Sequence, residues 1–147
     1  YQLPDDRRPF LLAELGADVA PAALAFEKAH AERPDLELYH PDVRAWEVTD
    51  RSGRHLGLFL GDYFARAGKR SGAWMSGFRG QEKLAGEIRP ISVNVMNFSK
   101  PAAGQPALLS LDEARTLFHE FGHALHGILA NGTYASLSGT NVPRDFV

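Results

Sequence analysis

Two histidines four residues apart, with a glutamate directly after the first, form the segment His119-Glu120-Phe121-Gly122-His123. On a helix with about 3.6 residues per turn, positions i and i+4 project from one face, so the two imidazoles can converge on one metal ion. Glu120 is rotated by about 100° from His119, which leaves its carboxylate free to face a water molecule that the metal activates. The pattern therefore predicts the centre of a zinc site that hydrolyses amide bonds.

Catalytic zinc usually has three protein ligands, and the third is not evident from the spacing. No histidine or glutamate follows His126, and Asp145 is the only carboxylate downstream. We interpret Asp145 as a charge at the start of a new helix in preference to a ligand, or as a group that supports the ligands. His126 shares the helix face of the pair but lies about 10 Å along the axis from His119, so it either supports the site or is solvated.

A helix over residues 111–130 must carry these side chains. Ser110 followed by Glu113 is a capping-box pattern for its start, and Asn131-Gly132 supplies residue types that end helices. Steps of about 100° place its apolar residues on one side: Ala114, Leu117, Phe118, Phe121, Ala124, Leu125, Ile128 and Leu129. We expect that side to face the core and the histidines to point away from it.

Strand patterns precede this helix. Residues 44–50 and 55–66 are rich in aromatic and branched residues and predict two antiparallel strands around a glycine-containing loop. Residues 91–98 alternate as a third, half-buried strand does. The glycine-rich stretch 68–75 lacks the spacing of a phosphate-binding loop, so we interpret it as a connection within the sheet.

The residues before the sheet carry no chemical signature. Residues 7–31 predict one or two short helices, and residues 34–43, with a proline near each end, predict an extended connector. Together these elements predict an α+β fold with N-terminal helices, a small antiparallel sheet and a metal-binding helix.

Composition limits the possible partners. The 147 residues are 44% apolar and 23% charged, which is typical of one globular domain. The net charge of −2 makes nucleic acid or an anionic membrane an unexpected partner, and no apolar run approaches the roughly 18 residues of a membrane span. The absence of cysteine leaves histidine, aspartate and glutamate as metal ligands and suits a cytoplasmic location.

The sequence resembles the thimet-oligopeptidase family (M3) of zinc peptidases, most closely its bacterial peptidyl-dipeptidase branch. Residues 117–126 and 138–147 carry the resemblance, with similar runs at residues 39–44, 71–75 and 100–104 in the family's order. The resemblance implies a zincin-like catalytic domain, with His119 and His123 as Zn²⁺ ligands and Glu120 as general base. It also implies a third ligand, a glutamate in the motif Asp-Phe-Val-Glu, directly after Val147.

Proteins of that family are several hundred residues long, mostly helical, and bind short peptides in a deep channel between two halves. Their oxyanion-binding tyrosine and histidine belong to a later segment. We therefore expect residues 1–37 to be an unassigned helical segment and connector, and residues 38–147 to be part of a catalytic domain that needs its remainder as a partner. Two alternatives stay open: an oligopeptidase that cuts internal bonds, and a non-catalytic metal-binding or structural module.

Overall fold

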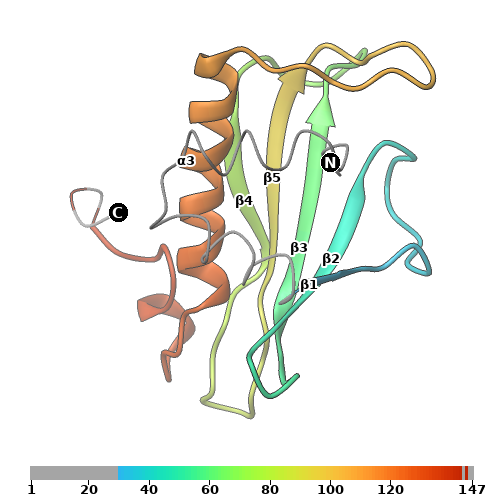
Figure 1. Ribbon diagram of the computed structural model, residues 1–147. Helices are drawn as coiled ribbons and strands as arrows, with labels where there is room; N and C mark the ends of the chain where they lie inside the picture. The colour runs from blue at the N-terminus through green and yellow to red at the C-terminus, as the bar shows by residue number, and fades with distance from the viewer. Residues whose placement is uncertain (1–29, 144, 146–147) are drawn as a thin grey trace, which may run out of the picture.

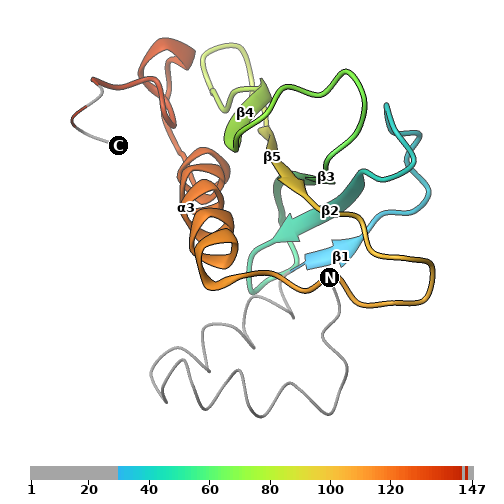
Figure 2. The same ribbon diagram turned by 90° about the horizontal axis from the view of Figure 1, so that it is seen from above.

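The computed structural model describes residues 30–143 and residue 145. It contains strands β1 (His30–Glu32), β2 (Arg44–Thr49), β3 (His55–Phe64), β4 (Trp74–Arg79) and β5 (Ile91–Phe98), helix α3 (Leu111–Ile128) and the short 3₁₀ helix η1 (Ala135–Leu137). The strands form one sheet in the order β1-β2-β3-β5-β4, and α3 lies against one of its faces (Figures 1 and 2). The predicted N-terminal helices lie outside the described residues, except that residues 30–31 belong to β1.

The sheet is mixed, so the prediction of a purely antiparallel sheet was wrong. β2 pairs antiparallel with β1 and β3, and β4 pairs antiparallel with β5, but β3 and β5 are parallel. The reason is the position of β4, whose first two residues, Trp74 and Met75, were predicted to lie in a connection and whose other residues were not predicted as a strand. β4 follows β3 in the chain, but it lies at the edge of the sheet and, among the described strands, pairs only with β5. Because β5 runs antiparallel to β4, it runs in the same direction as β3, and the two pair as parallel strands.

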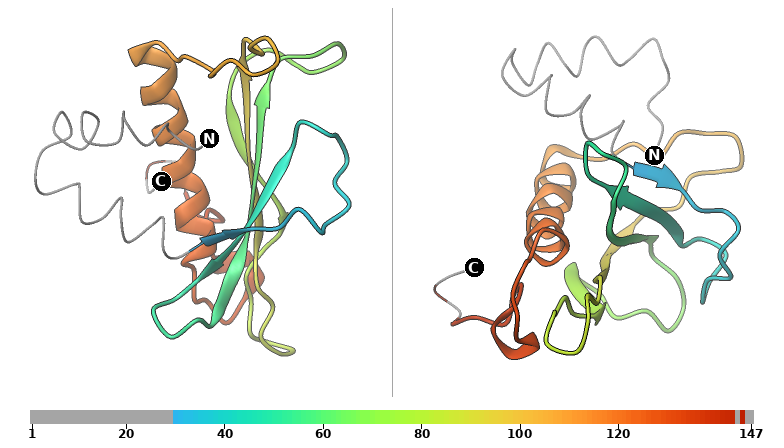
Figure 3. Two further views of the ribbon diagram at one scale, coloured as in Figure 1. Left: turned by 45° about the vertical axis from the view of Figure 1, so that its right-hand side comes forward. Right: turned by 90° about the horizontal axis from the view of Figure 1, so that it is seen from below.

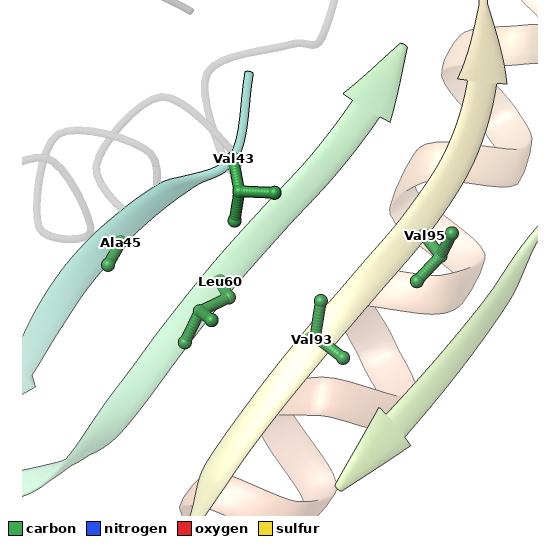
Figure 4. Close-up of a cluster of buried hydrophobic side chains, with 5 residues drawn as sticks. All are labelled: Val43, Ala45, Leu60, Val93 and Val95. Carbon is green, nitrogen blue, oxygen red and sulfur yellow. The ribbon is translucent and has the colours of Figure 1, made fainter. Parts of the chain in front are cut away.

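Alternating residues of the strands supply two separate apolar clusters. Val43, Ala45, Leu60, Val93 and Val95 form the first, shown in Figure 4 with α3 behind the sheet. The second lies between the sheet and the helix and contains Trp46, Val48, Phe59, Ala124 and Ile128. Because strand side chains alternate between faces, neighbours such as Ala45 and Trp46 belong to different clusters. The second cluster is the one that orients α3.

Helix α3 begins as predicted. The Ser110 hydroxyl accepts a hydrogen bond from the Glu113 backbone N–H, and the Glu113 carboxylate accepts one from the Ser110 N–H. The helix ends at Ile128, two residues before the predicted end. The predicted apolar side is too wide: Ala124 and Ile128 are buried, whereas Phe118 is 63% exposed.

A buried carboxylate ties the connection after β3 to the sheet. Asp62 is 2% exposed and accepts hydrogen bonds from Arg66 at 2.6 and 2.8 Å, from Lys69 at 3.0 Å and from Tyr39 at 3.0 Å. Burial by itself raises the pKa of Asp62, but these three partners outweigh it and lower the pKa to about 2. The network fixes residues 66–69, which belong to the connection between β3 and β4.

Replacing Asp62 by asparagine is expected to destabilise the chain by about 3 kcal/mol at pH 7, because the Lys69 ammonium, with a side chain 4% exposed, would lose its carboxylate. The folded-state pKa lies below the unfolded value of about 4, so the contribution is complete above that pH and is lost as the pH falls towards 2. Urea unfolding at pH 7, 4 and 2 measures both effects, with the exposed Glu37→Gln as control. If the difference in unfolding free energy between the Asp62→Asn variant and the unsubstituted chain does not shrink between pH 4 and pH 2, the low pKa assigned to Asp62 is wrong.

Candidate metal site

The side chains of His119 and His123 meet on the side of α3 that faces away from the apolar cluster. Their Nε2 atoms are 3.2 Å apart, and their rings are nearly perpendicular, at 89°. When one ring is protonated at Nε2, this distance permits an N–H···N hydrogen bond. With both Nε2 atoms unprotonated, the two lone pairs are available to a cation.

The same distance fits zinc. Imidazole nitrogens about 2.05 Å from a tetrahedral zinc ion would be about 3.3 Å apart. Within residues 30–143 and 145, however, no group of three histidine, aspartate or glutamate side chains could hold a metal ion. The described residues therefore provide two convergent imidazole side chains, a type of group that binds zinc in proteins.

Both histidines open into a pocket of about 550 Å³. Its lining comes from three segments: Ala73, Trp74 and Met75 at the start of β4, His119, Glu120 and His123 on α3, and Thr140 and Val142 after the helix. A second hollow of about 700 Å³ is lined by residues 135–136 and 140–143, and none of these lining residues has a titratable side chain. The pocket that includes the histidines, which we call the histidine pocket, is therefore the candidate site.

Packing against the sheet sets the rotation of α3. The ring of Phe121 packs edge-on against Phe59 with centroids 5.2 Å apart, and Ala124 and Ile128 are almost fully buried. Asn94 of β5 is 0% exposed, and its side-chain amide lies against the backbone of α3. In the amide orientation that satisfies both of its polar atoms, the nitrogen donates to the carbonyl oxygen of Glu120 and the oxygen accepts from the Phe121 N–H, each at 3.0 Å. A buried amide needs a partner, so this contact disfavours sliding of the helix along the sheet.

The other two candidate residues lie apart from the pair. His126 is partly buried and does not line the histidine pocket, and Asp145 is exposed. The pocket walls were missed by reasoning from ligand spacing. Trp74, Met75, Thr140 and Val142 belong to two of the runs that carry the family resemblance, and this was the only signal in the sequence that marked them.

No described segment combines the length and the apolar character that a helix needs to cross a membrane.

Comparison with known proteins places the chain among peptidases. The sequence profile of peptidase family M3 matches residues 23–147. Dipeptidyl carboxypeptidases of Escherichia coli (strain K12) and Salmonella typhimurium (strain LT2) are each 58% identical over 116 residues, which cover 79% of this chain and 17% of either relative. Oligopeptidase A of Escherichia coli is 44% identical over 119 residues, covering 79% of this chain and 18% of the relative. The chain thus spans less than a fifth of the length of these curated relatives.

Proposed function

Because the chain belongs to peptidase family M3, we propose that His119 and His123 hold a zinc ion and that Glu120 is the general base of a peptidase site. The observation that carries this proposal is the 3.2 Å approach of the two Nε2 atoms in a pocket that Glu120 also lines. Sequence identity favours a parent that releases dipeptides from the C-terminus of short peptides over one that cuts internal bonds.

The roles of the three side chains follow from their chemistry. When bound, zinc supplies Lewis acidity that polarises a peptide carbonyl and lowers the pKa of a water molecule. The Glu120 carboxylate accepts the proton of the attacking water and delivers it to the nitrogen of the departing amine. His119 and His123 must be unprotonated at Nε2 to hold the metal.

The position of β4 suggests how a peptide would lie in the histidine pocket. β4 ends the sheet, so its outer edge pairs with no other described strand, and its first residues, Trp74 and Met75, line the pocket beside Glu120. An extended peptide can add to such an edge through backbone hydrogen bonds that are independent of its sequence. Because these bonds do not depend on side chains, the edge of β4 could bind short peptides of many sequences.

We also propose that the rest of a longer catalytic domain covers the outer surface of α3. Leu111, Phe118 and Leu129 are 93%, 63% and 62% exposed, which is unusual for three large apolar residues on one helix. Relatives more than four times as long have the additional chain that could cover them. The third zinc ligand and the oxyanion donors would come from that additional part.

Zinc titration and a quenched-peptide assay test the function. The 147-residue chain is expected to bind zinc weakly and to hydrolyse little peptide, because two histidines alone are an incomplete site. A chimaeric enzyme, in which the aligned segment of this chain replaces its counterpart in the Escherichia coli dipeptidyl carboxypeptidase, is expected to bind about one zinc ion and to release dipeptides. A folded chimaera without zinc or activity would contradict the peptidase proposal, and robust turnover by the 147-residue chain would contradict the need for further ligands.

A further inference from the structure

A buried glutamine joins the end of β4 to the segment that follows α3. Gln81 is 2% exposed, and its side-chain nitrogen donates to the Gly132 carbonyl oxygen at 3.1 Å. Its side-chain oxygen accepts two hydrogen bonds, from the Gly132 N–H at 2.8 Å and from the Ser138 hydroxyl at 2.5 Å. All three bonds reach across more than 50 positions of sequence to one segment, residues 132–138.

Apart from hydrogen bonds within residues 132–141, such as that from the Asn141 side-chain nitrogen to the Ala135 carbonyl oxygen at 2.7 Å, few contacts between described residues determine the path of that segment. Ser138 is its only buried residue between positions 131 and 143, and η1 contains none. Tyr134 and Leu137 are 53% and 73% exposed, so apolar packing contributes little. A backbone hydrogen bond from Lys83 to Thr133, at 3.2 Å, adds a second link to the same connection after β4. Figures 2 and 3 show the two connections side by side.

Glycine is favoured at two positions here, at the first by close packing and at the second by a positive φ. A Cβ atom on Gly132 would lie 3.0 Å from the Cβ of Ser138. Gly139 has a φ of +62° and lies close to the backbone of Gly127 on α3. The hydrogen bonds of Gln81 therefore act at the point where the chain turns back towards α3.

We propose that Gln81 is a positioning residue that holds Thr140 and Val142 in place as one wall of the histidine pocket. These two residues lie two and four positions after Ser138, and they line the same pocket as Trp74 and Met75 of β4. The Gln81 amide fixes this wall relative to β4, because Gln81 lies two residues after Arg79, the last residue of that strand. The consequence for substrate binding rests on the peptidase function proposed above.

The variants Gln81→Leu and Ser138→Ala of the chimaeric enzyme test this role. Gln81→Leu removes all three hydrogen bonds and leaves the Gly132 and Ser138 groups without partners, whereas Ser138→Ala removes only one bond and should remain folded. We expect Gln81→Leu to raise KM for a quenched peptide by about 10- to 100-fold, more than it lowers kcat, because the wall contacts bound substrate. Ser138→Ala should change KM in the same direction by a smaller factor.

Two further measurements separate positioning from stability. Urea unfolding identifies conditions in which each variant is folded. The matched control is Gln105→Leu, which replaces an exposed glutamine before α3 and should leave both KM and the urea midpoint of the chimaera unchanged. If both variants keep KM within twofold of the parent while their urea midpoints fall, Gln81 is structural only and the proposal is overturned. If the unsubstituted chimaera binds no zinc, the proposed peptidase function is wrong. This outcome is therefore distinct from failure of the Gln81 proposal.

Discussion

Replacing Glu120 by glutamine in the chimaeric enzyme is expected to reduce peptide hydrolysis by about 10²- to 10⁴-fold while zinc affinity changes little. Glutamine has nearly the same shape as glutamate but cannot accept the proton of the attacking water. Because Glu120 lines the pocket without belonging to the histidine pair, its replacement leaves both Nε2 ligands in place. Steady-state kinetics and a zinc-chelator competition assay give the two quantities.

The matched control is Asp112→Asn, which removes an exposed carboxylate from the first turn of the same helix. It should leave kcat within about twofold, since surface substitutions rarely change a remote site. A Glu120→Gln enzyme that keeps more than a tenth of the parent kcat would show that another group accepts the proton.

Replacing His123 by alanine is expected to weaken zinc binding by more than about 100-fold and to abolish hydrolysis. Removal of groups that merely support metal ligands costs about 10- to 100-fold in affinity, so loss of a ligand should cost more. The fold should survive, because the ring lies on the side of α3 away from the apolar cluster. Zinc content after dialysis and the urea midpoint measure both expectations.

His126→Ala is the corresponding control, three residues further along the same helix. His126 does not line the histidine pocket, so the zinc affinity of the His126→Ala variant should equal that of the unsubstituted chimaera. A loss of zinc in His126→Ala as large as that in His123→Ala would contradict the assignment of the ligand pair.

Local sequence was sufficient for the helix that carries the candidate ligands. The capping box joins residues three positions apart, and the histidine pair depends on a separation of four, so both follow from helix geometry without tertiary contacts. The strands at residues 44–49, 55–64 and 91–98 were likewise recognisable from composition and alternation. The roles of His119, Glu120 and His123 in catalysis remain predictions.

Strand order was beyond the reach of local patterns. Trp74 and Met75 were assigned to a connection because glycines surround them, and nothing near them in sequence indicates pairing with β5. With β4 omitted, three strands joined in sequence suggested an antiparallel sheet. The parallel pair of β3 and β5 follows only once β4 is known to occupy the outer edge.

The sequence by itself determined the reactive groups: two histidines and a glutamate on one capped helix, in an order that resembles one peptidase family. The tertiary structure decided what surrounds them. Asp62 binds Tyr39 from the connection between β1 and β2 and Lys69 from the connection between β3 and β4, and Gln81 bonds residues more than 50 positions away. Such contacts depend on which segments the sheet brings together, so helix geometry could predict the histidine pair but not the walls of its pocket.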